Sequence, residues 1–260
     1  MSFSALRKGQ VVSYIESHRR GIRRWFLHHV PKTAGSSLAD EFAERLPPYW
    51  NLTVAYDAET GSTHDQMDRA VERFIAAGPQ TWRSASGHVM PRHIDRIAET
   101  CADVGFITFL RHPIARIVSE YRYCRTESHP PYRAFIERYP TIEDFVADPR
   151  EANKMSLYLF GQRDVSVEAA MARLRTRYAF VGLQERYPLS FRMMSILMWG
   201  GSSPQARSRV TSEDSENRVE LTPELTARIL EANALDLAIY RAVFELYAEI
   251  AEEAWTLEID

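Results

Sequence analysis

One stretch of the sequence brings together residue types that could hold an anion. Residues 25–38 read Trp-Phe-Leu-His-His-Val-Pro-Lys-Thr-Ala-Gly-Ser-Ser-Leu, so that an apolar run is followed by a turn containing Lys32 and Gly35. The apolar run suits a buried strand. Apolar residues then recur at fourfold spacing over 38–46, the pattern of an amphipathic helix. Backbone N–H groups and the helix dipole at such a junction favour a bound anion, and Lys32 adds a positive charge.

The choice of lysine in this loop is itself informative. Only Lys8, Lys32 and Lys154 are lysines among the 32 basic residues, and arginine is used elsewhere. A lysine in the loop therefore indicates a role for a compact ammonium group, although a solvated turn lysine is the alternative. A Walker A loop would end in Gly-Lys followed by Ser or Thr, and no Gly-Lys pair occurs in the chain. This order argues against an ordinary NTPase.

The helix after the loop needs an N-cap and favourable charge in its first turns. Ser36 or Ser37 is expected to cap it, and Asp40 and Glu41 suit the positive end of its dipole. The double proline at 47–48 ends the helix, because consecutive prolines cannot continue it.

A second candidate anion site follows the clearest buried strand, residues 104–110. Arg111 comes directly after this strand, at the edge of a parallel sheet where ligands bind, and Pro113 opens a helix that runs to Cys124. Ser119 lies roughly 9 Å further along the helix axis, close enough for both side chains to reach one phosphate. Arg116 is expected to share the face of Ser119. A surface helix with solvated arginines is the alternative.

These two segments resemble the nucleotide-binding motifs of one enzyme family. Residues 29–38 resemble the 5′-phosphosulfate loop of sulfotransferases, particularly the family that includes the heparan sulfate 2-O-sulfotransferases. Arg111 and Ser119, eight residues apart, match the 3′-phosphate motif of the same enzymes. The resemblance extends more weakly to 153–161, 180–186 and 233–240, for which helix and strand packing is the simpler explanation.

The resemblance implies a function and a set of binding residues. These enzymes use 3′-phosphoadenosine 5′-phosphosulfate (PAPS) as co-substrate, release 3′-phosphoadenosine 5′-phosphate (PAP), and need no metal. A sulfotransferase would move a sulfuryl group to a hydroxyl or amine acceptor by in-line transfer. The residues implied in PAPS binding are Lys32, Thr33, Ala34, Gly35, Ser36, Ser37, Arg111 and Ser119.

Catalysis of this kind needs a cation at the leaving group and a base at the acceptor. Lys32 is the candidate to stabilise charge on the departing phosphate oxygen. His88 follows Gly87 at the end of a predicted strand, and a Gly-His at a corresponding point of the 2-O-sulfotransferases supplies a catalytic histidine. A structural role for His88 is the alternative. His93 and, more weakly, Glu185 are the other candidate bases.

The remaining histidines and aromatic residues carry weaker expectations. His28 and His29 are expected to pack or hydrogen-bond within the first strand. Tyr49, Trp50 and Tyr132 are candidates to line an acceptor pocket.

Strands and helices alternate along the chain, which predicts an α/β fold with a central parallel sheet flanked by helices, a P-loop-like arrangement in three layers. The chain of 260 residues is expected to form a single domain, preceded by a polar arm over 1–24 that is a short helix or extended. A mobile loop is expected over 200–218, in which Arg207 and Arg209 would either close over a nucleotide or stay solvated. Strands are predicted at 25–30, 52–56, 81–89, 104–110 and 178–183, and helices at 38–46, 64–77, 92–100, 113–124, 153–160, 166–177, 188–199, 223–232 and 235–255. A further short helix is expected to be capped by Thr141, with Glu143 and Asp144 in its first turn.

Composition narrows the classes of partner. A net charge of −3, with 45% hydrophobic and 26% charged residues, is typical of a globular protein with no nucleic-acid partner. The sequence contains no run of 18 apolar residues and no secretory leader, so no membrane span is expected. The two cysteines, Cys101 and Cys124, lack metal-ligand spacing and favour a cytoplasmic setting.

Several functional alternatives stay open from the sequence. The acceptor is a small molecule or a carbohydrate, and a homodimer is one alternative for the assembly. The competing interpretations are a P-loop kinase or NTPase, a catalytically silent nucleotide-binding module, and an interaction protein with a helical partner surface.

Overall fold

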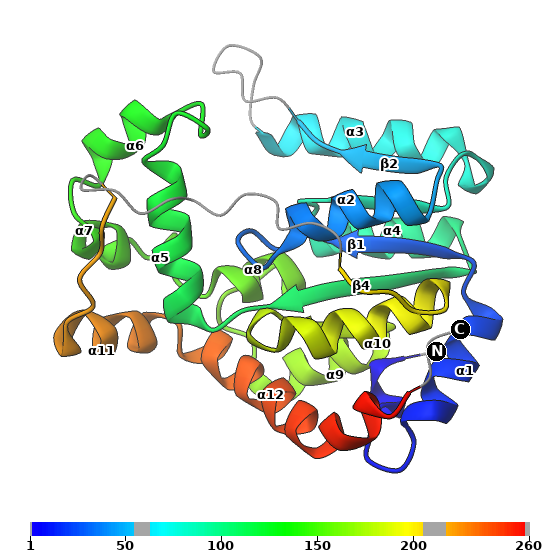
Figure 1. Cartoon of the computed structure of the whole chain (residues 1–260). Coiled ribbons are helices and arrows are strands. Elements are labelled where there is room, and N and C mark those ends of the chain that lie inside the picture. Colours follow the sequence, from blue (N-terminus) through cyan, green and yellow to red (C-terminus); the bar gives the residue numbers. More distant parts are fainter. Residues whose placement is uncertain (1, 55–62, 205–216, 258–260) are drawn as a thin grey trace.

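The central element is a parallel sheet in the order β2-β3-β1-β4-β5 (Figure 1). The computed structural model describes residues 2–54, 63–204 and 217–257. Within these residues the strands are β1 (Arg24–His28), β2 (Tyr49–Leu52), β3 (Ser84–Gly87), β4 (Val104–Leu110) and β5 (Phe180–Leu183). Every strand pair is parallel. The predicted parallel α/β sheet is therefore confirmed.

Helices cover both faces of this sheet and make the fold three-layered. In Figure 1, α2 and α10 lie in front of the sheet, and α4, α8 and α9 lie behind it. The helices of the described residues are α1 (Val11–Gly21), α2 (Gly35–Arg45), α3 (Thr63–Ala77), α4 (Pro91–Thr100), α5 (Pro113–Cys124), α6 (Tyr132–Arg138), α7 (Ile142–Ala147), α8 (Lys154–Phe160), α9 (Val167–Arg177), α10 (Tyr187–Trp199), α11 (Pro223–Ala232) and α12 (Ala234–Trp255). None of them is long and apolar enough to cross a lipid bilayer.

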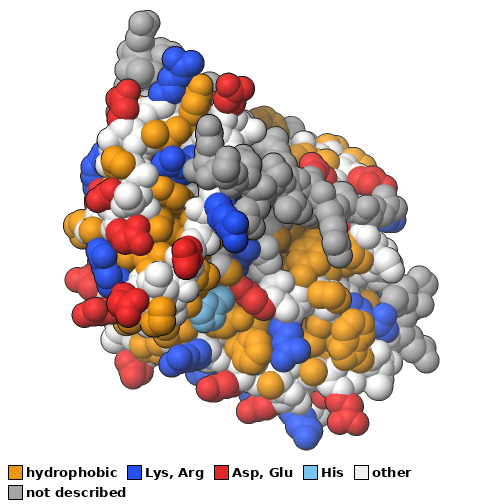
Figure 2. Space-filling view, turned by 60° about the vertical axis from the view of Figure 1, so that its left-hand side comes forward, with side chains coloured by type: hydrophobic (Ala, Val, Ile, Leu, Met, Phe, Trp, Pro, Cys, Tyr) orange, Lys and Arg blue, Asp and Glu red, His pale blue; other side chains and the backbone are white. Residues whose placement is uncertain are grey.

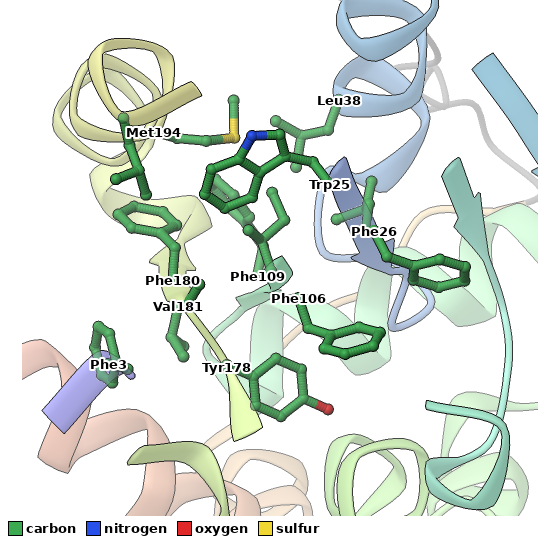
Figure 3. Packing of buried hydrophobic residues seen from close by; sticks show 14 of the residues in the cluster. Phe3, Trp25, Phe26, Leu38, Phe106, Phe109, Tyr178, Phe180, Val181 and Met194 are labelled. Carbon is green, nitrogen blue, oxygen red and sulfur yellow. The ribbon is translucent and has the colours of Figure 1, made fainter. Parts of the chain in front are cut away.

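The core forms because successive side chains of a buried strand point to opposite faces of the sheet. Trp25 lies beside Leu38 and Met194, whereas its neighbour Phe26 lies on the other side of the sheet beside Phe106 (Figure 3). The Phe26 and Phe106 ring centroids are 5.9 Å apart. A strand with both faces buried reads as a continuous apolar run, which is why β1 and β4 are recognisable from sequence.

The parallel register brings the carboxyl ends of four strands to one edge of the sheet. His28 of β1 is paired with Gly87 of β3, and Leu27 is paired with Ile107 of β4. Leu110 of β4 is paired in turn with Leu183 of β5. The segments that follow these strands must therefore lie next to one another, and they include both of the predicted anion sites.

A smaller hydrophobic cluster lies beyond this edge. It joins α5, α6, α7 and α11, which group together on the left of Figure 1. Its buried residues include Ile117 and Tyr121 of α5, Phe145 of α7 and Ile229 of α11. Helix α6, which the sequence analysis did not predict, packs Phe135 against this cluster. The cluster fixes α5 as a helix that extends past the end of the sheet.

Residues 2–24 are part of the folded body. Phe3, Leu6 and Tyr14 are buried in the main core. The Val11 N–H donates to Glu253 Oε1 at 2.8 Å, which ties the start of α1 to the end of α12. Within residues 1–24, the segment 11–21 is helical.

The second strand starts earlier in the sequence than predicted. The second strand is Tyr49–Leu52, whereas it was predicted at 52–56, because the chain enters the sheet directly after the double proline. Only residues up to 54 of the predicted strand are described. Most of the predicted loop 200–218, with Arg207 and Arg209, lies outside the described residues.

Candidate functional site

A cavity of about 1300 Å³ lies along the carboxyl edge of the sheet. Its walls come from the segments that follow β1, β3, β4 and β5, together with α5 and α8. Most of the predicted site residues line it: Lys32, Ala34, Gly35, Ser36, Ser37, His88, Arg111 and Ser119. The structure therefore brings these residues to one cavity from three separate stretches of the chain.

The loop between β1 and α2 has a backbone suited to binding an anion. Lys32 and Ala34 adopt left-handed conformations, with φ of 67° and 73°. Ala34 is the N-cap of α2, and no side chain caps this helix. The N–H groups and the dipole at the start of such a helix favour a bound anion.

One prediction for this loop is wrong, and the Thr33 side chain has a structural role. Ser36 and Ser37 lie inside the first turn of α2 and do not cap it, because the helix begins earlier, at Gly35. Thr33 is buried and its Oγ1 donates to the Val30 carbonyl at 2.9 Å, which closes the turn. The Thr33 side chain is therefore not among those that line the cavity.

Gly35 is required by a close approach of the His29 side chain. A Cβ atom on Gly35 would lie 1.9 Å from His29 Cδ2. The His29 ring also lies against His88, with ring centroids 3.9 Å apart. His29 thus lines the cavity, whereas it was expected to pack within the strand. Its sequence position directly after a strand is the only signal that could have indicated this.

The two predicted anion sites are in direct contact. Arg111 Nη1 donates to the Lys32 carbonyl oxygen at 3.1 Å. Ser119 lines the same cavity from α5, and Lys32 Nζ lies 4.2 Å from the centre of the Tyr123 ring on the same helix. Lys32 and Arg111 therefore lie next to each other in the wall of one cavity.

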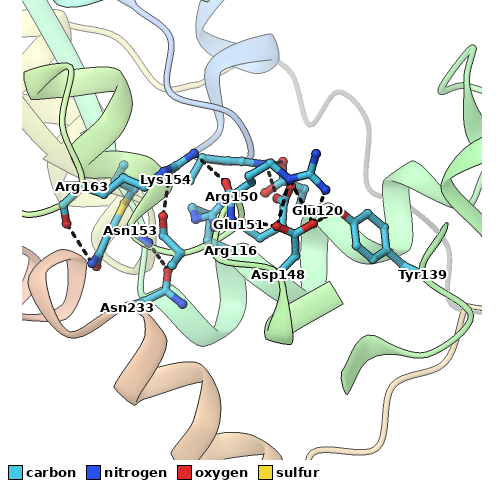
Figure 4. Close-up of polar contacts among 12 residues, drawn as sticks. Arg116, Glu120, Tyr139, Asp148, Arg150, Glu151, Asn153, Lys154, Arg163 and Asn233 are labelled. Atoms are coloured by element: carbon cyan, nitrogen blue, oxygen red, sulfur yellow. Dashed lines mark hydrogen bonds and ion pairs between the residues drawn. The ribbon is translucent and has the colours of Figure 1, made fainter. Parts of the chain in front are cut away.

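Arg116 has a different role from the one predicted. Its side chain is fully buried, and Nη1 donates to Glu120 Oε2 at 2.5 Å (Figure 4). Glu120 also accepts from Lys154 Nζ at 2.7 Å. Burial by itself would raise the pKa of Glu120. The positive charges of Lys154 and Arg116 outweigh this effect and lower the pKa to about 2, so this carboxylate at the cavity wall is ionised. Arg116 holds Glu120 and does not line the cavity.

Helix α8 is held in place from the C-terminal part of the chain. The buried Asp236 carboxylate accepts from the N–H groups of Met155 at 2.9 Å and Ser156 at 2.8 Å. Asn153 and Asn233 also bond to each other, through the Asn153 N–H at 2.9 Å. The weakly resembling segments 153–161 and 233–240 thus contact one another, and they position Lys154 beside the cavity.

His88 lines the cavity as a neutral imidazole with a free lone pair on Nε2. Its Nδ1 lies 2.7 Å from the His29 carbonyl oxygen, which can only accept, so Nδ1 carries the proton and Nε2 the lone pair. Desolvation by the surrounding protein lowers the pKa of His88, and Lys32 lowers it too, while the bond to His29 and the charge of Glu120 oppose this. The side chain nevertheless remains exposed to the cavity. Neutral imidazole is therefore the form present at pH 7.

The other two candidate bases are engaged elsewhere. His93 Nδ1 accepts from the Met90 N–H at 3.0 Å, and its Nε2 bonds Asp68 Oδ1 at 2.5 Å. Glu185 Oε1 accepts from the His112 N–H at 2.9 Å, at the start of α5. Both residues line the cavity, but their polar atoms serve local structure.

Part of the cavity wall is apolar. Val54, Met67, Met90 and Tyr158 line it, and the Tyr158 ring centroid lies 6.4 Å from that of His88. Arg92, which also lines the cavity, is paired with Asp68 at 2.8 Å. The sequence analysis missed Met67 as a lining residue because its helical spacing indicated only a core position.

The aromatic residues predicted to line an acceptor pocket lie elsewhere. The Tyr49 hydroxyl forms a hydrogen bond of 2.6 Å with Ser86 Oγ within the sheet. The Trp50 ring packs on Phe74, with ring centroids 5.5 Å apart. Tyr132 lies on α6. None of these three residues lines the cavity.

Comparison with solved structures gives the class of fold. A sulfotransferase from Alicyclobacillus acidocaldarius matches this chain with a TM-score of 0.50 at 15% identity, covering 85% of this chain and 95% of that one. Mouse sulfotransferase SULT7A1, solved in complex with PAP, matches with a TM-score of 0.29 at 17% identity, covering 93% and 91%. The first of these likenesses establishes a sulfotransferase-like α/β fold. Comparisons with protein-family models and with curated proteins give no match.

Proposed function

We propose that this protein is a PAPS-dependent sulfotransferase that transfers a sulfuryl group to a hydroxyl or amine acceptor. The observation that carries the proposal is the hydrogen bond from Arg111 Nη1 to the Lys32 carbonyl. It joins two anion-binding segments within one cavity, and PAPS is a nucleotide with phosphate at both ends of its ribose. The match of residues 29–38, Arg111 and Ser119 to the motifs of this family supports the same proposal.

The donor-side residues have distinct roles in this proposal. Lys32 and the N–H groups at the start of α2 hold the 5′-phosphosulfate, and Arg111 with Ser119 holds the 3′-phosphate. PAPS supplies the sulfuryl group and a phosphate leaving group. Lys32 stabilises the negative charge that develops on that leaving oxygen.

His88 is the general base of this proposal. A hydroxyl acceptor must lose its proton, and a neutral imidazole with Nε2 unprotonated can take it. The bond from Nδ1 to the His29 carbonyl keeps the ring in this tautomer. Ionised Glu120, whose charge raises the pKa of His88, stabilises the imidazolium that results.

We propose a small molecule with an apolar body as the acceptor, in preference to an anionic carbohydrate. Apolar side chains of Val54, Met67 and Met90 line the cavity that contains His88, and Arg92 in the same wall is already paired with Asp68. Figure 2 shows Lys and Arg side chains interspersed with Asp and Glu on the face that it presents, with no continuous basic track among the coloured residues. Turnover of a desulfated heparin oligosaccharide in preference to 2-naphthol would contradict this choice.

Isothermal titration calorimetry with PAP, 5′-AMP and ATP tests the proposed function. PAP is expected to bind at least about tenfold tighter than 5′-AMP, since only PAP carries the 3′-phosphate. Arg111→Ala should remove this preference and leave 5′-AMP binding nearly unchanged. Tighter binding of ATP with magnesium would favour a kinase or NTPase. Binding of PAP without transfer from PAPS to any of a panel of alcohols and amines would favour a silent nucleotide-binding module.

A further inference from the structure

We propose that Tyr123 is a positioning residue for Lys32. Its ring face holds the Lys32 ammonium group between the two anion-binding segments, so that the cation is in place before the nucleotide binds. This inference rests on the proposed function for its kinetic consequence, but the contact itself can be tested without turnover.

The contact has the geometry of a cation–π interaction. Lys32 Nζ lies 4.2 Å from the centre of the Tyr123 ring. Cations are attracted to an aromatic face within about 6 Å of its centre, and more strongly where water is partly excluded. Both residues are half-buried in the cavity wall. The ring thus contacts the end of a side chain that has four rotatable bonds, and this contact restricts its rotamers.

The Tyr123 ring is itself held from two sides. Its hydroxyl donates to the Ser128 carbonyl oxygen at 3.1 Å. The His129 ring lies against it, with centroids 5.7 Å apart. The hydroxyl therefore faces the segment after α5, while the face of the ring is available to the lysine.

Lys32 is constrained at its backbone as well as at its side chain. Its φ of 67° is unusual for a residue other than glycine, and such conformations persist only where the surroundings impose them. Arg111 Nη1 bonds its carbonyl oxygen at 3.1 Å. The conformation of Lys32 is thus set by contacts from both ends of the segment 111–123.

Helix α5 joins these contacts to the second anion site. Ser119 and Tyr123 are four residues apart, and both line the cavity. The helix therefore presents the hydroxyl proposed to bind the 3′-phosphate one turn away from the ring that holds Lys32. Any shift of α5 would move both groups together.

Substitutions at Tyr123 separate the ring from the hydroxyl. Tyr123→Leu removes the π face and is expected to lower kcat about tenfold with little change in the KM for PAPS. Tyr123→Phe keeps the ring and should restore most of the loss. Tyr132→Leu is the matched control, because it removes a tyrosine that lies beneath Arg133 outside the cavity. A raised acceptor KM at unchanged kcat would instead make Tyr123 an acceptor-wall residue and overturn the proposal.

A double-mutant cycle tests whether Tyr123 acts through Lys32. In a Lys32→Ala background, Tyr123→Leu should lower kcat by less than about twofold, because the group it positions is absent. A full tenfold loss in that background would show that the ring acts on something else, and would contradict the proposal.

A spectroscopic test does not depend on turnover. Reductive methylation with ¹³C-formaldehyde labels the lysines and keeps their charge, and Lys8, Lys32 and Lys154 are the only lysines. The Lys32 methyl signal should be shifted upfield by the Tyr123 ring, and should move downfield in Tyr123→Leu while the Lys154 signal stays. An unchanged Lys32 signal would refute the contact. If the signal moves but PAP does not bind, the proposed function fails and the contact stands.

Discussion

At the scale of single residues, the candidate site depends on a positive charge on one side chain and a lone pair on another. Lys32 carries a positive charge, and its backbone carbonyl accepts a hydrogen bond from Arg111. His88 carries a lone pair on Nε2 because its Nδ1 donates to the His29 carbonyl. Each of the two makes a separate prediction.

Removal of the Lys32 ammonium should slow transfer much more than it disturbs the fold. We expect Lys32→Ala to lower kcat on the order of 10²–10³-fold, because charge on the leaving phosphate oxygen loses its counter-charge. Lys8→Ala is the control, since Lys8 is an exposed residue that does not line the cavity. Steady-state kinetics with PAPS and a thermal melt of both variants are the measurements. Near-normal turnover by Lys32→Ala would remove Lys32 from the mechanism.

His88 should control the acid limb of the pH–rate profile. The protein lowers the pKa of His88 below its ordinary value, mainly by desolvation, so the base form persists below pH 6.5. The kcat/KM for the acceptor should therefore be level near neutrality and fall only as the pH drops below that value.

Substitution of His88 provides the check. His88→Asn keeps a donor for the His29 carbonyl but removes the base, and should lower kcat about 10²–10⁴-fold and abolish the acid limb. Nucleotide binding by this variant, measured by calorimetry with PAP, should stay intact. An acid limb that survives in His88→Asn would assign the base to another group.

At the scale of elements, the junction of β1 and α2 places the anion loop beside the segment that follows β3. The turn is closed from within by Thr33, and α2 starts at Gly35, where the His29 ring leaves no room for a side chain. The same ring contacts His88 after β3. The anion loop and the candidate base are thus connected through His29.

A methyl group at position 35 should displace the His29 ring and so disturb its contact with His88. Gly35→Ala would place Cβ 1.9 Å from His29 Cδ2, so the ring must move. We expect destabilisation of about 1–3 kcal/mol in urea unfolding and a marked loss of PAP affinity. The pair Gly35→Ala with His29→Ala should recover stability relative to Gly35→Ala alone, because the smaller residue makes room. Failure of the second substitution to recover any stability would show that the clash lies elsewhere.

At the scale of the whole molecule, one cavity lies between the sheet edge and α5, the helix that the smaller hydrophobic cluster packs against. Several histidines are packed near the sheet as neutral groups. His28 is fully buried, with Nδ1 bonded to the Tyr178 hydroxyl at 2.7 Å and Nε2 to the Val89 carbonyl at 2.8 Å. Burial lowers its pKa to about 4.

Stability should therefore decrease as the solution becomes acidic. Between pH 6.5 and about 4 the unfolded chain binds a proton at His28 that the folded protein does not. The free energy of unfolding is accordingly largest above pH 6.5 and falls as the pH drops toward 4, by on the order of 3 kcal/mol from this residue.

Urea unfolding across this range measures the effect. The slope of unfolding free energy against pH should be smaller by about one proton equivalent in His28→Gln than in the wild type near pH 5. The slope is the readout, because His28→Gln also changes packing at every pH. Equal slopes in the two proteins would contradict the assignment of a neutral buried His28.

The interior of the fold was largely predictable from sequence. Strand β4 and helix α5 have the predicted bounds, since a doubly buried strand is continuously apolar and Pro113 marks the first helical turn. The short helix predicted to be capped by Thr141 is α7, and Thr141 forms a capping box with Asp144. Local signals sufficed for these elements because each depends on residues close in the chain.

The cavity walls were less predictable because distant contacts decide them. Arg116 shares a helix with Ser119, yet Glu120 and Lys154 draw it into the protein. Tyr49 and Trp50 looked suited to a pocket, but they pack within the sheet and against α3. Side chains of one type can meet solvent, core or ligand, and helical spacing alone does not distinguish these.

By itself the sequence determined the parallel α/β architecture and the two strand-end segments that carry Lys32 and Arg111. Their residue types and spacing express local backbone geometry, which acts over one or two turns. Only the tertiary structure decided that Arg111 bonds the Lys32 carbonyl, that His29 separates Gly35 from His88, and that Tyr123 lies beside the ammonium. The physical reason is that these contacts join segments on different strands, so they depend on the strand order and register of the sheet.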